Sequence, residues 1–399
     1  MPKSLDEKLV AIHADPSGCR EFILADAKDA DMAFGIPGPG VVRHDDGFER
    51  FRTLEEFREQ IRSIVRQGIV DIMLMSASTA EQLVLKERLF DGSPVTPAVR
   101  ANDATDIHVM RGSRIPTEGS QPFRTLALDH AQCGHLDCET AERELGVDLG
   151  LYSVTFNNDR QLDLNILEAY KAFREEAERK KFRHFLEVFN PNLPDAVAPE
   201  QMPQFINDVI ARTLAGVPRA GRPIFLKIAY NGPAAMEELV AYDPHLVVGI
   251  LGGSSGTTLD AFLLLAEAQK YGARAALFGR KINNAENQLA FVEFLRLIAD
   301  GVIEPVEAVR AYHAVLGKLG IHPHRSLDED LTLQTSVMSY GGNGKAVSLP
   351  VSAKPQAAKS ASTNDRRLSD SMDTPDFARM TSDERLAYHR ARLNRTFGE

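Results

Sequence analysis

The chain has 399 residues, of which 43% are hydrophobic and 26% are charged, and its formal net charge at pH 7 is −10. These values are typical of a soluble globular protein, and the acidic balance argues against broad nucleic-acid binding. No apolar run is long enough to span a membrane, the N-terminus lacks the apolar core of a signal peptide, and three cysteines do not make a disulfide framework. We therefore expect a cytoplasmic metabolic protein that binds neither nucleic acid nor membranes.

Short apolar runs alternate with helical patterns along most of the chain. After a helical pattern at Leu5–His13, eight apolar runs predict buried strands: one starting at Phe22, then 69–75, 95–99, 150–156, 184–189, 224–229, 246–251 and 275–278. Helices are predicted at 54–67, 80–90, 164–180, 203–214, 234–241, 259–271, 290–299 and 305–316. Continuous apolar strands separated by helices indicate a parallel sheet covered on both faces. Eight such units favour an α/β protein with a closed (β/α)8 barrel, or TIM barrel, over an open sheet.

The sequence departs from this rhythm in three places. We predict that the barrel occupies residues 1–320 and that an insertion of about 104–146 follows its third strand. This insertion reads as a hairpin or long loop with a helix at Cys138–Leu145. Residues 321–372 predict an irregular or flexible segment, because they become rich in Gly, Ser, Ala and Lys. Residues 373–399 predict an Arg-rich helical tail, and such additions lead us to expect a homo-oligomer.

The most unusual residue is Lys227, in the middle of the sixth predicted strand. A lysine in a buried strand is costly unless it is paired, or neutral and used chemically. Burial near a second cation lowers the pKa of a lysine, and the neutral amine can attack a ketone to form a Schiff base. If Lys227 faces the barrel interior, it lies beside Glu187 of the fifth strand. We predict catalysis by Lys227 with Glu187 and then Asp26 as proton-transfer groups; the alternative is an ion pair that only fills the barrel.

Further polar residues follow the other strands at their carboxyl ends, where the active sites of such barrels lie. We expect substrate-binding residues among them: Asp29, Arg100, Asn102, Ser153 and Asn157. After the seventh strand, GGSSG precedes a helix, and Gly-Arg follows the eighth strand. Small residues, the N–H groups of a helix start and a cation together make an anion site. The predicted phosphate-binding residues are Gly252, Gly253, Ser254, Ser255, Gly279 and Arg280.

These motifs resemble a known group of enzymes. The LxK of strand six, the GGSSG and the FGR resemble the class I (Schiff-base) aldolases of the deoxyribose-phosphate, tagatose-bisphosphate and archaeal-type fructose-bisphosphate group. FLEVF in strand five and ILAD in strand one resemble segments that carry an active-site glutamate and aspartate there. The resemblance implies that Lys227 forms the imine, that Glu187 and Asp26 handle protons or bind hydroxyl groups, and that the two glycine loops bind phosphate.

The resemblance also has gaps. Ser153 stands roughly where the tagatose enzymes carry a second lysine, and Phe189 roughly where the archaeal fructose-bisphosphate enzymes carry a catalytic tyrosine. Tyr152 or Tyr230 could take the place of that tyrosine. We predict a class I aldolase, an aldehyde-lyase of carbohydrate metabolism, that cleaves or forms a C–C bond in a phosphorylated keto-sugar or related sugar acid without a cofactor or metal.

Two alternatives to this function stay open. The first is a metal-dependent lyase or isomerase on sugar phosphates that uses Asp29, Asp31 and Asp103. The second is an aldolase-like barrel that binds a sugar phosphate for regulation without turnover. The H-x2-C-x-H-x2-C pattern at 130–138 offers zinc ligands, but its spacing is unusual and loop residues are the favoured interpretation. Lys28, which lies between acidic residues, is expected to be their partner at the surface.

Overall fold

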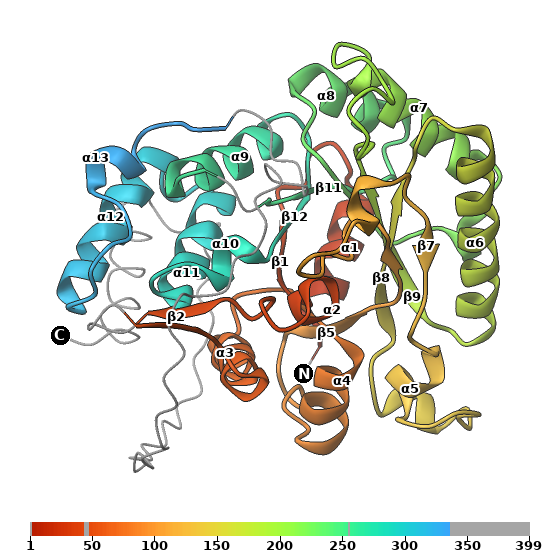
Figure 1. Ribbon diagram of the computed structural model, residues 1–399, viewed down its shortest axis with the longest axis horizontal. Coiled ribbons are helices and arrows are strands. Elements are labelled where there is room, and N and C mark those ends of the chain that lie inside the picture. The colour runs from red at the N-terminus through yellow and green to blue at the C-terminus, as the bar shows by residue number, and fades with distance from the viewer. Residues whose placement is uncertain (1, 44–47, 254–255, 336–399) are drawn as a thin grey trace. The chain divides into compact units, whose positions relative to one another are not determined.

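The computed structural model describes residues 2–43, 48–253 and 256–335, so residues 336–372 of the predicted irregular segment and the predicted tail lie outside it. Eight parallel strands close into a barrel in the order β1-β12-β11-β10-β9-β8-β5-β4, which confirms the predicted (β/α)8 fold (Figure 1). Every predicted strand is present. The barrel strands are β1 (Ile23–Lys28), β4 (Ile72–Met75), β5 (Thr96–Arg100), β8 (Leu149–Thr155), β9 (Arg183–Phe189), β10 (Leu226–Ile228), β11 (Val248–Leu251) and β12 (Ala275–Phe278).

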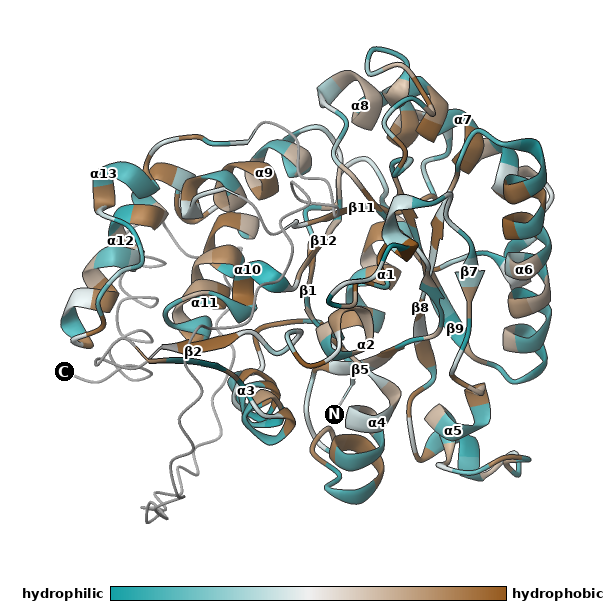
Figure 2. Ribbon diagram, in the orientation of Figure 1, coloured by the Kyte–Doolittle hydropathy of each residue, from teal (hydrophilic) through white to brown (hydrophobic). Residues whose placement is uncertain are grey.

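Amphipathic helices pack around the barrel, and Figure 2 shows hydrophobic and hydrophilic residues alternating along them. The longer helices are α1 (Ser4–Ala14), α3 (Leu54–Gln67), α6 (Arg160–Arg179), α7 (Met202–Ala215), α8 (Pro233–Tyr242), α9 (Thr258–Lys270), α11 (Gln288–Ala299) and α12 (Pro305–Lys318). Short helices are α2 (Ala30–Phe34), α4 (Ala77–Ala80), α5 (Leu128–Gln132), α10 (Arg280–Asn283) and α13 (Leu327–Asp330). Helix α3 has the predicted bounds, because a Thr53/Glu56 capping box begins it and left-handed Gly68 ends it. Within the described residues, no helix combines the length and apolarity needed to cross a membrane.

Two helical predictions differ from the structure. The pattern at 80–90 continues α4 as a π-helical turn, Glu81–Lys86, rather than as a regular α-helix. The helix predicted at Cys138–Leu145 is reduced to a 3-10 turn, Glu142–Glu144. A disulfide joins Cys133 to Cys138, and Asp137, just before the predicted start of the helix, has a left-handed backbone.

The region between β5 and β8 contains a small hairpin. Its strands, β6 (Asp103–Ala104) and β7 (Pro122–Phe123), pair antiparallel. Two other short strands, β2 (Val41–Arg43) and β3 (Glu49–Phe51), follow α2. The hairpin residues Ala104 and Ile107 belong to an apolar cluster with Phe189, Ala229 and Leu251 at the carboxyl ends of the barrel strands. The region after the third barrel strand therefore covers part of the barrel mouth.

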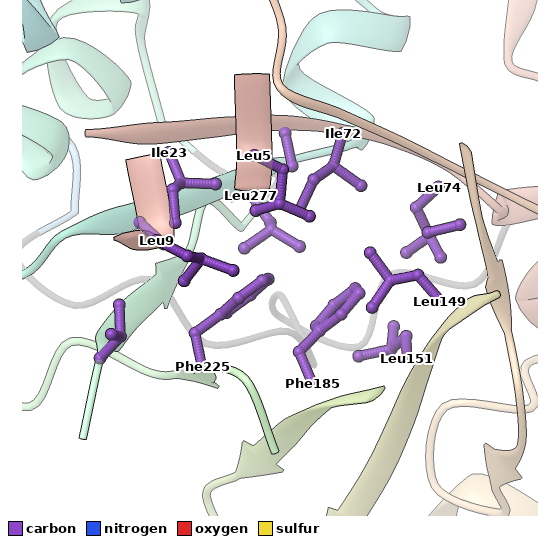
Figure 3. Close-up of a cluster of buried hydrophobic side chains, with 14 of the residues drawn as sticks. Leu5, Leu9, Ile23, Ile72, Leu74, Leu149, Leu151, Phe185, Phe225 and Leu277 are labelled. Atoms are coloured by element: carbon purple, nitrogen blue, oxygen red, sulfur yellow. The ribbon is translucent and has the colours of Figure 1, made fainter. Parts of the chain in front are cut away.

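A larger apolar cluster fills the amino-terminal part of the barrel. Leu5 and Leu9 of α1 close its end, and the rings of Phe185 and Phe225 stack inside it at 4.5 Å (Figure 3). Alternate strand residues belong to this interior, so the faces of every strand can be assigned from it. The interior residues of the barrel strands are Ile23, Ala25, Ala27, Ile72, Leu74, Ala98, Leu149, Leu151, Phe185, Phe225, Val247, Ala275 and Leu277. The two apolar clusters leave one interior layer between them, and that layer is polar.

Candidate active site

Lys227 and Glu187 face each other in the polar layer of the barrel. They are register partners on the adjacent strands β10 and β9. Each lies two residues beyond an interior phenylalanine, Phe225 or Phe185, and so points to the same side. The Nζ atom of Lys227 lies 2.5 Å from Oε1 of Glu187, and the two side chains are 4% and 0% exposed. The two residues therefore lie side by side in the barrel interior, as the sequence predicted, and they form an ion pair that is shielded from water.

Ser153 and Arg100 extend this pair across the barrel. Ser153 is the register partner of Glu187 on β8, and its hydroxyl donates a 2.6 Å hydrogen bond to Glu187 Oε2. Arg100, at the end of β5, donates from Nη1 to the Ser153 hydroxyl at 3.2 Å, and its Nη2 lies 3.9 Å from Glu187 Oε2. Glu187 therefore contacts a hydroxyl donor and two cations, which hold its carboxylate in one orientation.

Asp29 completes the group from the first strand. It follows β1, and its Oδ2 accepts a 2.5 Å hydrogen bond from Nε of Arg100. Asp103 Oδ1 lies 3.6 Å from Nη1 of the same guanidinium. Arg100 is thus surrounded by the carboxylates of Asp29, Asp103 and Glu187. A guanidinium in this position orients all three, because its donors have fixed directions.

Burial raises the pKa of Asp103 to about 6, although Arg100 partly opposes this. Since the folded chain keeps the proton up to about pH 6 and the unfolded chain releases it near pH 4, ionisation of Asp103 destabilises the fold as pH rises between these values. Asp103→Asn carries no such proton, so we expect it to gain up to about 3 kcal/mol relative to wild type between about pH 4 and pH 7. Urea unfolding of both proteins across this range measures the gain; a stability difference independent of pH would contradict it.

A small cavity opens beside Lys227 between the ends of β1, β11 and β12. We call it the Lys227 cavity; the polar, charged and glycine residues that line it are Asp29, Arg100, Lys227, Gly252, Gly253, Gly279 and Arg280. Gly253 has a left-handed φ of 59°, and a Cβ on Gly279 would come within 2.7 Å of the Ala27 carbonyl oxygen. The volume of about 30 Å³ holds little more than one water molecule. The cavity lined by the described residues is therefore smaller than a sugar phosphate.

The structure brings part of the predicted phosphate site to this cavity. Gly252, Gly253, Gly279 and Arg280 line it, whereas Ser254 and Ser255 lie outside the described residues. The guanidinium of Arg280 lies over the ring of Phe34, 5.2 Å from its centroid. Phe34 lines the same cavity, so the Arg280 guanidinium is held at its wall.

The first amides of α9, by contrast, are already occupied. Asp260 accepts from the Thr257 N–H at 2.7 Å, and Asp330 accepts from the Thr258 N–H at 2.7 Å. The prediction that the start of this helix binds an anion is therefore wrong for the N–H groups of Thr257 and Thr258. The sequence analysis also missed Lys281, whose Nζ donates to the carbonyl oxygens of residues 256 and 257 at 2.6 and 2.9 Å and fixes the loop there.

Asp26 does not lie with Lys227 and Glu187 in the barrel interior. Ala25 and Ala27 belong to the interior cluster, so Asp26 and Lys28 point from β1 toward the surrounding helices. They pair with each other, with Lys28 Nζ 2.9 Å from Asp26 Oδ2 and both side chains 0% exposed. Burial raises the pKa of Asp26 and lowers the pKa of Lys28, each partly offset by the other. The prediction that Lys28 lies at the surface is wrong, and Asp29 occupies the interior position expected for Asp26.

Both predicted asparagines have structural partners. The Asn102 side chain accepts from the Ser153 N–H at 2.6 Å and donates to the Ser153 carbonyl at 2.8 Å. The Asn157 side chain makes the same two bonds to Ser120, at 2.6 and 3.0 Å. Two backbone bonds occupy each amide and tie a neighbouring segment to the barrel, so the structure does not bring either asparagine to the Lys227 cavity.

Neither alternative tyrosine reaches Lys227. Tyr152 lies on the outer face of β8 and stacks on Phe173 at 4.4 Å. The Tyr230 hydroxyl donates to Glu267 of α9 at 2.8 Å. The hydroxyl in contact with Glu187 is that of Ser153.

The residues considered as metal ligands, the aspartates and the Cys/His pattern at 130–138, have other partners in the structure. Asp29 and Asp103 both contact Arg100, so a metal ion would have to displace a guanidinium, and Asp31 lines a different cavity. Cys133, His135 and Glu142 come close enough to one another to hold an ion. The Cys133 sulfur is bonded to Cys138, however, which removes its thiolate as a ligand.

The fold is a (β/α)8 TIM barrel with a lysine buried in its interior. The structure is similar to an archaeal fructose 1,6-bisphosphate aldolase, with a TM-score of 0.52 and 16% identity over 75% of this chain and 100% of that one. It is similar to a fructose-bisphosphate aldolase from Slackia heliotrinireducens, with a TM-score of 0.54 and 14% identity over 80% of this chain and 93% of that one.

A third similar structure is an archaeal fructose-1,6-bisphosphate aldolase whose catalytic lysine is covalently bound to a carbinolamine intermediate, with a TM-score of 0.52 and 16% identity over 74% of this chain and 99% of that one. No protein-family model matches the sequence, and no curated protein sequence matches it. At these identities the likeness establishes the fold. It confirms, at that level, the resemblance to class I aldolase barrels.

Proposed function

We propose that the protein is a class I aldolase that acts on a phosphorylated keto-sugar or related sugar acid through a Schiff base on Lys227. One observation carries the proposal: the Lys227 amine lies 2.5 Å from Glu187, and Lys227 lines a small cavity that Arg280 also lines. An amine with a carboxylate in contact can lose and regain its proton without water. A guanidinium near glycine backbone is suited to a phosphate group.

The proposed reaction begins with proton transfer from Lys227 to Glu187. The neutral amine attacks the ketone carbon and forms a carbinolamine, and Glu187 returns a proton to the hydroxyl that leaves as water. The resulting iminium accepts the electron pair of the adjacent C–C bond when a carboxylate removes the proton of the substrate hydroxyl. This step releases an aldehyde and leaves an enamine, which is protonated at carbon and hydrolysed to the second product.

We assign removal of the hydroxyl proton to Asp29 in place of Asp26. Asp29 lines the Lys227 cavity, and its bond to Arg100 directs one carboxylate oxygen away from the guanidinium fork. Arg100 and Ser153 then orient the two carboxylates and supply hydrogen bonds to hydroxyl groups of the substrate. The pattern of hydroxyl groups that fits between them would set the choice of sugar.

Borohydride trapping tests the proposal directly. We expect dihydroxyacetone phosphate with sodium borohydride to leave a reduced adduct on Lys227, found by mass spectrometry of its peptide. Unphosphorylated dihydroxyacetone is the matched control, and should label at least about tenfold less at equal concentration because it lacks the charge-assisted phosphate contacts. An adduct on other lysines but not on Lys227, across a panel of ketose phosphates, would end the Schiff-base assignment.

A further inference from the structure

Four side chains of the kinds that bind zinc lie together in the segment that follows helix α5 (Figure 1). They are Cys133, His135, Cys138 and Glu142, and we call them the cysteine loop. The sulfur, ring nitrogen and carboxylate oxygen of Cys133, His135 and Glu142 all lie within 4.8 Å of one another. The Cys138 sulfur is bonded to that of Cys133 and therefore lies in the same group. The described lining of the Lys227 cavity contains none of the four residues.

The ring of His135 is oriented like that of a metal ligand. Its Nδ1 lies 2.8 Å from the carbonyl oxygen of Leu136. Because a carbonyl oxygen can only accept a hydrogen bond, Nδ1 carries the proton, and Nε2 offers a lone pair when the ring is neutral. Histidines that bind metals typically donate their other ring N–H to a carbonyl or carboxylate in this way.

The carboxylate of Glu142 faces that ring nitrogen. Its Oε1 lies 3.4 Å from His135 Nε2, and its Oε2 accepts a 2.9 Å hydrogen bond from the Glu139 N–H, which fixes its orientation. A lone pair and a carboxylate oxygen can face each other only with a proton or a metal ion between them. Ligand atoms around a tetrahedral zinc ion lie about 3.3–3.8 Å apart, so this pair already has the spacing of two zinc ligands.

The state of the two cysteines decides whether the other ligands are available. A disulfide sulfur is a poor ligand, whereas a thiolate binds zinc strongly. Cys133 is partly exposed and Cys138 is buried, so a thiol can reach the Cys133 sulfur from solvent. The neighbouring carboxylate of Asp129 is already bound by Lys180 at 2.6 Å, which leaves Glu142 as the carboxylate of the site.

We propose that reduction of the Cys133–Cys138 disulfide converts the cysteine loop into a tetrahedral zinc site. Two thiol groups of a reductant break the S–S bond; the reductant becomes a disulfide, and each cysteine gains one proton. A Zn²⁺ ion then displaces these two protons, and the two thiolates bind it with His135 Nε2 and Glu142 Oε1. The loop is closed by a disulfide under oxidising conditions and by zinc under reducing conditions. The proposal does not depend on the aldolase reaction.

Zinc binding by the full chain in its two redox states tests the proposal. One sample is reduced with a phosphine, which takes an oxygen atom from water as the cysteines become thiols; the other keeps its disulfide. A chelator removes metal from both, and alkylation with mass spectrometry verifies the cysteines. In competition with a zinc-binding dye, we expect the reduced chain to bind one Zn²⁺ at least about a hundredfold more tightly than the oxidised chain. Equal affinities would overturn the proposal.

Matched variants of the reduced chain identify the ligands. His135→Gln should weaken zinc binding about tenfold or more, whereas His130→Gln, at the other histidine of the H-x2-C-x-H-x2-C pattern, should leave it unchanged because the described cluster does not include it. Cys133→Ser should weaken binding about a hundredfold or more, and Cys19→Ser, at the free cysteine, should have no effect. Co²⁺ provides a second readout, because cobalt bound to thiolates shows a charge-transfer band that Cys133→Ser should diminish.

The carboxylate is tested in the same way. Glu142→Gln should weaken zinc binding about tenfold, and Glu144→Gln, at an exposed glutamate of the same turn, should not. His135 is 56% exposed, so its variant is expected to fold and keeps the test decisive if a cysteine variant does not. If His135→Gln and Glu142→Gln both bound zinc like the wild type, or if cobalt bound without the thiolate band, this site would be refuted.

Discussion

Replacing Lys227 with arginine is expected to reduce turnover by about 10⁴-fold or more. Arginine preserves the positive charge opposite Glu187, which the structure places 2.5 Å from the lysine amine. A guanidinium does not lose its proton in proteins, however, and cannot form the imine. The measurement is the rate of aldehyde release from ketose phosphates found by borohydride trapping, together with thermal unfolding to show that the variant is folded.

Lys180→Met is the matched control for this variant. Lys180 also pairs with a carboxylate, Asp129 at 2.6 Å, but it lies on the outside of the barrel at 24% exposure. We expect its turnover to stay within about twofold of wild type, since a partly exposed pair contributes little. If folded Lys227→Arg retained a tenth of wild-type turnover, the amine would not be the nucleophile and the proposed mechanism would fail.

The sequence predicted the pairing of Lys227 with Glu187 because each residue interrupts an apolar strand. Lys227 follows Phe225 by two positions and Glu187 follows Phe185 by two, so each charged residue shares a strand face with a phenylalanine. Adjacent strands in a parallel barrel then bring the two together. The local patterns predicted burial of both residues, and the pairing followed on the condition that both face the interior, which the register of β9 and β10 satisfies.

Strand β1 shows where local patterns fail. All six of its residues are buried, because a barrel strand packs against the interior on one face and helices on the other. Acidic residues occur on both faces, with Asp26 outward and Asp29 inward. Alternation alone cannot say which face is the interior. The answer comes from its pairing with β4 and β12, where Ala25 lies beside Ile72 and Leu277.

Hydrogen bonds to residues far away in the sequence account for the other wrong predictions, those of ligand binding by the two asparagines and by the start of α9. Asn102 bonds a residue 51 positions away, and Asn157 one 37 positions away. The Thr258 N–H, which looked available to phosphate, is taken by Asp330 across 72 positions. Polar residues at strand ends are equally suited to binding a ligand and to closing the fold. Only the folded contacts distinguish these two uses.

Lys28→Met is expected to destabilise the fold by about 3–5 kcal/mol, because it leaves the Asp26 carboxylate buried without its partner. Replacing both residues, as Asp26→Leu with Lys28→Met, removes two buried charges together. This double variant should recover to wild-type stability or exceed it by about 1–4 kcal/mol. Urea unfolding of the two variants measures the difference, with Lys180→Met, at a more exposed pair, expected to change stability by less than about 1 kcal/mol.

The same double variant decides between the two aspartates of the first strand. Asp26 faces the helices, whereas Asp29 lies in the Lys227 cavity beside Arg100. We therefore expect the folded double variant to keep turnover within about threefold of wild type, and Asp29→Asn to lose about 10²-fold or more as a proton-transfer group. Loss of turnover in a stable double variant would return catalysis to Asp26. Because stability and turnover are predicted to move independently here, the pair of measurements separates a buried structural charge from one that acts on the substrate.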